Sequence, residues 1–470
     1  MQLCKLLALL TFVVAIPINA QDCNCKTAFA WVKQTFEEND AGFQFVINRK
    51  GEQAYAIHNQ LIAERIKTAR NNQECADIIT DWLHFFREVH LGVRVLRDDV
   101  VEESTNEIAS NFLDWKRVDV DINEFIEMHS AGKEIICFEG IWLDFSGSFG
   151  IKKVDEQYIG FVIESRTEEW KSRQIRFRVF PDSVIYYMDD RSVRRFNRAE
   201  LLSRNALVFD YDLNFSFQRY SEQEDRFLQS IHTGQPHLKR LNEHTLYLRI
   251  PSFSQRVLQD IDSLLLSNKD KITQTENLII DLRINSGGTD EGWWFHLMPM
   301  IATNPVRIRN SYTLSTELTI QLKEQFGRMP WILDRLRDNL GNFVLRFDDR
   351  GRHYYEPFKS ESGSYGIYPK QVGIIVDRYT ASAAESFLLA ARQSRRVKIF
   401  GHPTMGALDF SEILWTESPC GNFQLTYATS KLVDIDKFPI DGIGIQPDFF
   451  LGGIPGYRWV DFVNDILNHR

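Results

Sequence analysis

Several features are scarce or absent in this sequence of 470 residues. After the first twenty residues, no segment is long and apolar enough to span a bilayer. The chain has no block of basic charge and a formal net charge of −9, which argues against nucleic acid as a partner. Only 14 prolines and 25% charged residues occur, so no bias toward disorder is present. The chain is therefore expected to fold around a large core, and its length suggests about three domains.

Metal-binding patterns are also missing. There is no His-Glu-x-x-His, the eleven histidines form no cluster with ligand spacing, and the only close cysteine pair is Cys23 and Cys25. We therefore expect no metal and no cofactor. Either Cys23 or Cys25 could bridge Cys75 across two N-terminal helices, and the sequence leaves both pairings open.

The first twenty residues are typical of an export signal. Lys5 supplies a positive charge, residues 6–16 are apolar but too short to span a membrane, and Ala20 ends a plausible cleavage site. An N-terminal anchor or a lipid at Cys23 is less well supported, because residues 20–25 lack the flanking sequence that either would need. We expect an exported protein, periplasmic or extracellular, without stable membrane insertion.

The hydrophobic pattern divides the chain into regions. Residues 1–20 form the signal, and residues 21–120 form an N-terminal region that is helical from about 27 to 87, with apolar residues mostly three and four apart. Residues 121–240 alternate with period two and predict an antiparallel β module, with strands at 149–152, 158–163, 175–179 and 184–187. Within it, residues 201–235 are expected to be an irregular connection.

Residues 241–470 alternate between strand and helix. Strands are expected at 246–250, 278–282, 372–377 and 398–401, and helices at 257–265 and 383–392. The strands are almost continuously apolar, which is typical of strands covered on both faces. This region is predicted to be an α/β domain.

The first chemically suggestive loop is Asp281-Leu-Arg-Ile-Asn-Ser-Gly-Gly288, directly after a strand. Paired glycines let backbone N–H groups turn toward a reacting oxygen with no Cβ in the way. From the glycines alone, a tight turn that begins a helix is the favoured interpretation.

The second loop, residues 377–386, places Ser382 where a strand gives way to a helix. The N–H groups and positive potential of a helix N-terminus can stabilise a developing oxyanion beside such a hydroxyl. Ser382 is also a favourable N-cap, with Glu385 at the capping-box position. The local pattern does not separate these two interpretations.

Five motifs occur in order between Thr245 and Phe449, and together they resemble the C-terminal processing (tail-specific) serine proteases, more closely their tricorn-core-like branch. The resemblance implies a crotonase-like layered α/β core and Ser382 as the nucleophile, beside the N-terminal helical layer and the inserted antiparallel β module expected from the hydrophobic pattern. The motifs are Tyr247-Leu-Arg-Ile-Pro251, Asp281-Leu-Arg-x-Asn-x-Gly-Gly288, Ser382-Ala-Ala-Glu385, Gly401-x-x-Thr404-x-Gly406 and Gly442-Ile-Gly444-Ile-Gln-Pro447-Asp448.

The sequence departs from the family at Ala407, where many members carry a lysine general base. The resemblance to the tricorn-like branch implies a serine–histidine–acid arrangement instead. In that arrangement His90 would be the base and Asp441 the acid that orients it. Ala383, with Gly287 or Gly288, would supply the oxyanion N–H groups.

Other residues near the loops have more ordinary expected roles. We expect Asp281, Arg283 and Asn285 to brace the glycine loop, whereas Trp293 and Trp294 could equally line a pocket or pack in the core. The β module does not resemble a peptide-gripping PDZ domain, so we expect it to shape access or to mediate oligomerisation.

The function expected from the resemblance is a serine peptidase that acts on peptides or proteins through an acyl-enzyme, as a monomer or a homo-oligomer. The rival hypothesis is a catalytically inactive peptide- or ligand-binding protein on the same fold, motivated by Ala407 and by aspartate at position 441. An esterase of the α/β-hydrolase type is disfavoured because the sequence has no Gly-x-Ser-x-Gly.

Overall fold

The computed structural model describes residues 24–96, 112, 114–130, 137–210, 212–220, 226–327, 330–346, 354–355 and 366–469. The predicted export signal and Cys23 lie outside the described residues. The chain divides into two compact units. The first unit consists of Met1–Val100, Leu314–Val344 and Glu412–Ser430, and the second of Val101–Thr313, Leu345–Ser411 and Lys431–Arg470.

The N-terminal part of the first unit contains the helices expected from its apolar periodicity. Asn24 and Asn71 begin two of them as N-caps, each accepting a backbone N–H three residues ahead, from Thr27 at 3.0 Å and from Glu74 at 2.8 Å. Their apolar faces meet around Phe36 and Trp82, which are fully buried. The helices are α1 (Cys25–Asn39), α2 (Phe43–Lys50), α3 (Glu52–Ile66) and α4 (Asn72–His84).

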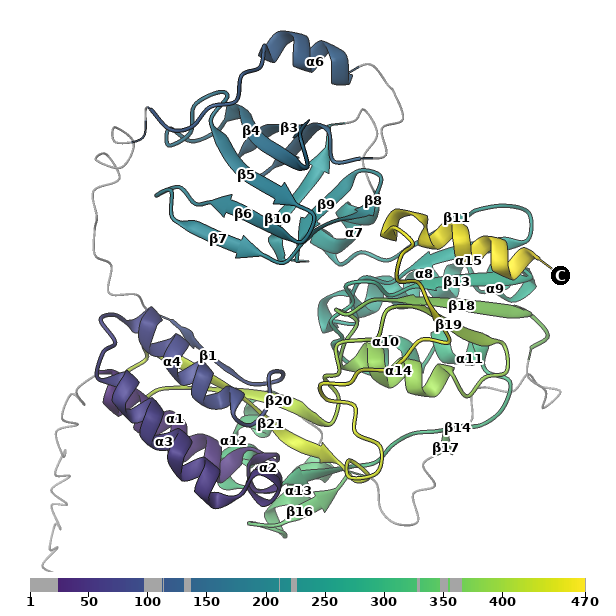
Figure 1. The fold of residues 1–470 in the computed structure, drawn as a ribbon. Helices are drawn as coiled ribbons and strands as arrows, with labels where there is room; N and C mark the ends of the chain where they lie inside the picture. The colour runs from purple at the N-terminus through teal and green to yellow at the C-terminus, as the bar shows by residue number, and fades with distance from the viewer. Residues whose placement is uncertain are drawn as a thin grey trace, which may run out of the picture. The chain divides into compact units, whose positions relative to one another are not determined.

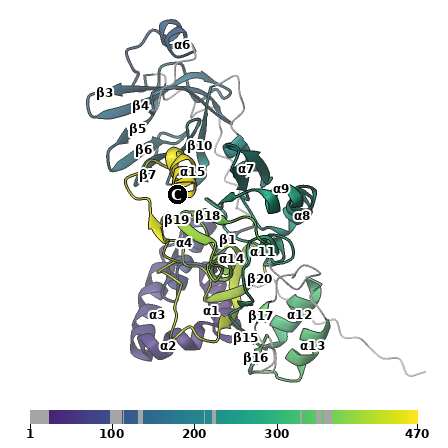
Figure 2. The ribbon, with the colours of Figure 1, turned by 90° about the vertical axis from the view of Figure 1, so that its right-hand side faces the viewer.

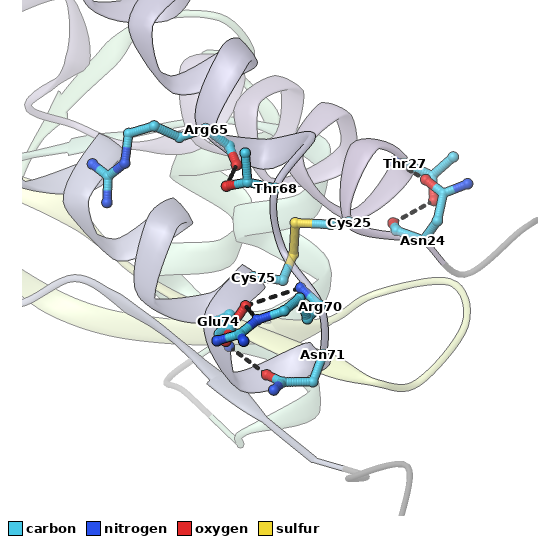
Figure 3. Close-up of a disulfide and its surroundings, with 9 residues drawn as sticks. All are labelled: Asn24, Cys25, Thr27, Arg65, Thr68, Arg70, Asn71, Glu74 and Cys75. Atoms are coloured by element: carbon cyan, nitrogen blue, oxygen red, sulfur yellow. Dashed lines mark hydrogen bonds and ion pairs between the residues drawn. A yellow bond between two sulfur atoms is a disulfide. The ribbon is translucent and has the colours of Figure 1, made fainter.

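A disulfide joins the beginnings of two of these helices (Figure 3). It links Cys25 at the start of α1 to Cys75 in the first turn of α4, with Cα atoms 5.6 Å apart. Of the two pairings that the sequence leaves open, the structure therefore contains the one through Cys25.

The helices pack on a sheet whose strand order is β1-β21-β15-β16, with β20 beside β21. β1 runs antiparallel to β21, with Gly92 opposite Thr426. The remaining elements of this region are β1 (Gly92–Val95), β15 (Ser311–Leu314), α12 (Glu317–Gln325), α13 (Pro330–Arg337), β16 (Phe343–Leu345), β20 (Phe410–Glu417) and β21 (Phe423–Leu432).

The β module lies in the second unit and is an antiparallel sheet in the order β7-β6-β5-β4-β3-β2-β10-β9-β8. Figure 2 shows β3 to β7 following one another across it. Aromatic side chains from distant strands meet inside the curled sheet. The ring centroids of Phe177 and Phe209 lie 5.1 Å apart, and those of Tyr186 and Phe215 lie 4.8 Å apart. The elements are α6 (Ile122–Ser130), β2 (Gly140–Asp144), β3 (Gly147–Val154), β4 (Gln157–Ser165), β5 (Ile175–Phe180), β6 (Ser183–Tyr187), β7 (Val193–Phe196), β8 (Ala199–Ser203), β9 (Ala206–Phe209), β10 (Asp212–Arg219) and α7 (Arg226–Thr233).

The four strands expected in this module are confirmed as parts of β3 to β6, but the irregular connection expected at 201–235 is wrong. That stretch contains the end of β8, all of β9 and β10, and helix α7. The aromatic core of the sheet is completed by Phe209, Phe215 and Phe217 on these strands, and their burial stabilises the strands. Polar residues between these phenylalanines interrupt the apolar pattern, so the strands are not evident from the sequence.

The α/β prediction is confirmed by a second sheet in the order β11-β12-β13-β18-β19-β22, parallel from β12 onward. Both faces are covered: α15 packs against Ile279 and Ile375, while α8, α11 and α14 cover Ile280 and Ile374 (Figure 1). The elements are β11 (His237–Arg240), β12 (Thr245–Arg249), η1 (Gln255–Val257), α8 (Leu258–Ser267), α9 (Lys269–Gln274), β13 (Asn277–Asp281), α10 (Glu291–Trp294), α11 (Leu297–Ile301), β18 (Gln371–Val376), α14 (Ala383–Ala391), β19 (Val397–Gly401), β22 (Phe449–Phe450), η2 (Gly456–Arg458) and α15 (Trp459–Asn468).

A short two-stranded sheet pairs β14 (Val306–Arg307) with β17 (Tyr354–Tyr355). None of the helices in the described part of the chain combines the length and the apolar character needed to cross a bilayer.

Candidate functional site

Ser382 sits in the turn that leads from β18 into α14, at the carboxyl ends of the parallel strands. Its backbone adopts φ 55°, a left-handed conformation that is uncommon for a residue with a side chain and occurs often at functional sites. Ala383 begins the helix, and its N–H has no helical acceptor because it belongs to the first turn. The hydroxyl-bearing residue is therefore followed at once by a helix N-terminus.

Glu385, fully buried, holds this turn in place. One carboxylate oxygen accepts from the Thr404 hydroxyl at 2.5 Å and from Gly406 N at 2.8 Å; the other accepts from Ala407 N at 2.8 Å and from Ser382 N at 2.9 Å. Burial raises the pKa of Glu385, and these hydrogen bonds oppose that rise. Glu385 thus joins the Ser382 turn to the loop after β19.

The paired glycines lie directly against Ser382. At Gly287, with φ 96°, a Cβ would stand 2.7 Å from the Cβ of Ser382 and 2.8 Å from the N atom of Ala383, so only glycine fits. The N–H of Gly287 donates to the side-chain oxygen of Asn285 at 2.9 Å. Within the described part of the chain, the N–H groups of Gly288 and Ala383 have no hydrogen-bond acceptor, so Gly288 is the better oxyanion candidate of the two glycines.

The residues predicted to brace the glycine loop do so. The Asn285 side chain donates to Ile250 O at 3.0 Å, and its backbone oxygen accepts from Ala381 N at 2.9 Å. Ile284 is held at φ 61°, where its N–H lies 3.1 Å from both carboxylate oxygens of Asp377. The two loops are therefore tied to one another before any substrate binds.

Asp281 anchors the base of the glycine loop in a fully buried ionic group. Its carboxylate lies 2.6 Å from Arg283 and 3.7 Å from Arg249, and it accepts from the Tyr247 hydroxyl at 2.9 Å. Burial alone would raise the pKa of Asp281, but the two guanidinium groups outweigh burial and lower it to about 2. The carboxylate is charged at neutral pH.

Asp441 lies in the turn before Gly442 and is paired with Asp409. One Asp441 oxygen accepts from Leu408 N at 2.8 Å and Asp409 N at 2.7 Å, and one Asp409 oxygen accepts from Ile440 N at 2.7 Å and Asp441 N at 2.8 Å. Burial raises the pKa of Asp409. Asp409 has no distinctive sequence pattern, because it is a single aspartate between apolar residues.

His90 belongs to the first unit and precedes β1 with φ 60°. A buried ion pair holds the segment just before His90. Both terminal nitrogens of the Arg87 guanidinium donate to the carboxylate of Asp40, at 2.8 and 2.5 Å. Asp40 also accepts from Ala428 N at 3.1 Å, which connects this segment to β21.

The structure thus brings Ser382, Ala383, Gly287 and Gly288 together in the second unit. Asp441 is connected to them through residues 406–408, and His90 lies in the first unit. Such a group offers a nucleophilic hydroxyl with two preorganised N–H donors, which suits attack on a carbonyl carbon.

Trp293 and Trp294 differ in burial. Trp293 is buried against Phe387, with ring centroids 5.8 Å apart, which agrees with the core-packing interpretation, and Trp294 is half-buried at the edge of the same core. Among the described residues, no three His, Cys, Asp or Glu side chains form a group that could hold a metal ion.

Residues 244–451 match the model of Peptidase family S41. This match places a serine-type peptidase domain, which is a hydrolase, in that part of the chain. The substrates of such an enzyme are peptides or proteins. The match contains Ser382, Asp441 and both oxyanion candidates, whereas His90 lies outside it.

Three solved structures illustrate the similarity of the whole chain. A crystal structure of a CPAF mutant is similar with a TM-score of 0.52 and 11% identity, over 94% of this chain and 96% of that one, and shows a shared fold. The tricorn protease has a TM-score of 0.41 and 12% identity over 94% and 36% of the two chains. The photosystem II D1 C-terminal processing protease has a TM-score of 0.39 and 11% identity over 91% and 93%. No curated protein sequence matches the chain.

The buried Asp281 group predicts a pH-dependent stability. Since folding lowers the pKa of Asp281 to about 2, its contribution is present above the unfolded value near pH 4 and is lost as the pH falls toward 2. Asp281→Asn leaves two buried guanidinium groups short of a counter-charge and should destabilise the protein by about 3–5 kcal/mol at pH 7. Thermal unfolding at pH 7 and pH 3 measures this, with exposed Asp155→Asn as the control; an equal loss at both pH values would contradict it.

Proposed function

We propose that the protein is an exported serine peptidase that hydrolyses peptide bonds through an acyl-enzyme on Ser382. The observation that carries the proposal is the Ser382 turn, in which a serine at positive φ heads a helix and lies against a glycine loop that offers a second N–H donor. A purely structural N-cap would need neither the unusual backbone conformation nor the contact with Gly287.

In the proposed reaction, His90 takes the proton of the Ser382 hydroxyl as its oxygen attacks the carbonyl carbon of the substrate. The N–H groups of Ala383 and Gly288 stabilise the oxyanion of the tetrahedral intermediate. His90 then passes the proton to the leaving amine, and the carbon–nitrogen bond breaks. A water molecule, deprotonated by His90, releases the acid product and regenerates the serine.

Asp441 is proposed to orient His90 and to stabilise its imidazolium form. The hydrogen bonds from Leu408 and Asp409 occupy one Asp441 oxygen and fix the direction of the carboxylate. A lysine general base is not available at position 407, because a buried alanine stands there and its N–H is bound to Glu385. This arrangement favours a histidine-based branch of the family.

A serine-directed probe tests the proposal. A fluorophosphonate should label the purified protein once, at Ser382, and Ser382→Ala should abolish both labelling and peptide hydrolysis. Ser386→Ala is the matched control, because Ser386 lies one turn further along the same helix and should leave labelling intact. Labelling that persists in Ser382→Ala would refute the nucleophile assignment, and a wild-type protein that is never labelled would favour the inactive binding protein.

The pH profile tests the base. If a histidine is the base, kcat/KM should rise with pH as that histidine loses its proton. His90→Ala should reduce kcat by roughly 10²- to 10⁴-fold, as is typical for loss of a general base, and should remove this rise. The control is His84→Ala, at the exposed end of α4. A pH profile that is unchanged in His90→Ala would exclude His90 as the base.

Asp441→Asn tests the acid with little structural change, because the amide oxygen can still accept from Leu408 and Asp409. Turnover should fall, by up to about 10⁴-fold as in the precedent of a triad aspartate, since the amide favours the wrong histidine tautomer. Asp441→Glu should retain much more activity. Asp409→Asn, which alters the partner carboxylate, should cost far less. Near-wild-type kcat/KM in Asp441→Asn would mean that serine and histidine act without this acid.

A further inference from the structure

We propose that Tyr379 is a positioning residue. Through it, the β module would fix the position of the turn that carries Ser382 relative to the loop that carries Gly288. The β module would then be a working part of the active site, in addition to any role in access. This inference rests on the proposed function, because it concerns the alignment of Ser382 with Gly288.

Tyr379 lies three residues before Ser382 and reaches out of the α/β domain into the β module. Its hydroxyl donates to the backbone oxygen of Asp210, at the turn between β9 and β10, at 2.7 Å. Its ring packs against a buried cluster formed by Leu202, Ala206, Val208, Phe227 and Leu228, which come from β8, β9 and α7. The nucleophile loop is therefore bound to the module by a polar and an apolar contact at once.

The glycine loop is anchored in the same cluster. Ile284 packs beside Tyr379 against it, and Arg283 donates from its side chain to Leu202 O at 3.1 Å. The Arg283 guanidinium also lies 4.5 Å from the centre of the Phe227 ring, within the range of a cation–π contact. The same buried cluster of the β module thus contacts both loops of the candidate site.

Asp377 connects the two anchors. Its buried carboxylate accepts from the N–H of Tyr379 at 3.0 Å and from the N–H of Ile284 at 3.1 Å. A displacement of Tyr379 is therefore transmitted to Ile284, three residues before Gly287. The Ser382 turn and the glycine loop therefore both depend on the Asp377 carboxylate and on the same buried cluster of the β module.

The acceptor on the β module is itself fixed. Asp210 adopts φ 46°, and its carboxylate accepts from Asn197 N at 2.7 Å and from Arg198 N at 3.1 Å. Its own N–H donates to Arg198 O at 3.0 Å. Since the turn is held on both sides, the Asp210 carbonyl is a preorganised partner for the Tyr379 hydroxyl.

Tyr379→Phe isolates the contact, because it removes one hydroxyl and keeps the ring in the cluster. The matched control is Tyr186→Phe, which removes a buried hydroxyl that accepts from Arg176 at 2.8 Å inside the core of the same module. The two variants should lose similar amounts of thermal stability. Only Tyr379→Phe should lower kcat, by about tenfold, while KM stays within about twofold of wild type.

A second measurement does not depend on activity. Hydrogen exchange of the backbone amides in residues 282–288 and 378–384 should be faster in Tyr379→Phe than in wild type, and unchanged in Tyr186→Phe. Equal kcat values in the two variants, or exchange that is unchanged in both loops, would overturn the positioning role.

The two proposals fail in different ways. If Ser382→Ala is still labelled and still hydrolyses peptides, the proposed function fails, yet the exchange experiment still decides whether Tyr379 couples the loops. If Ser382 is the labelled nucleophile and Tyr379→Phe behaves as Tyr186→Phe does, the function stands and the positioning role is wrong.

Discussion

The buried carboxylate of Glu385 is the interaction on which the candidate site depends. Its two oxygens accept four hydrogen bonds that join the Ser382 turn to Thr404, Gly406 and Ala407. Burying a carboxylate is costly unless such donors surround it, and here three of the four donors are backbone N–H groups, which themselves need an acceptor. A substitution at this position would disturb two loops at once, which makes the arrangement rigid as well as stable.

The same physical solution recurs in the neighbouring loops. Asp377 binds the N–H groups of Ile284 and Tyr379, and the carboxylates of Asp409 and Asp441 each accept the backbone N–H of the other residue. Loops at the ends of parallel strands have no ladder partners, so their N–H groups need other acceptors. Acidic side chains supply these acceptors.

The β module enlarges this frame. Its cluster around Phe227 receives Tyr379 from one loop and Ile284 from the other, and Arg283 reaches across to Leu202. The β module is therefore in direct contact with both loops of the candidate site.

Local sequence determined the elements that have a strong hydrophobic pattern. The parallel strands, the helix after Ser382 and the period-two strands at 149–187 could be read from apolar spacing, because each element buries a continuous face or stripe. The ordered motifs likewise led to the prediction of Ser382 and the paired glycines as site residues. The stretch 201–235 was misread because Phe209, Phe215 and Phe217 are separated by polar residues, and only the closing of the curled sheet buries them together.

Tertiary structure alone decided the finer chemistry. The two glycines are equivalent in sequence, but Asn285 occupies the N–H of Gly287 and leaves that of Gly288. Asp409 has no pattern of its own, and its pairing with Asp441 joins segments about thirty residues apart. The bond from Tyr379 to Asp210 spans 169 positions of sequence, a separation at which local pattern carries no information about which side chain will meet which carbonyl.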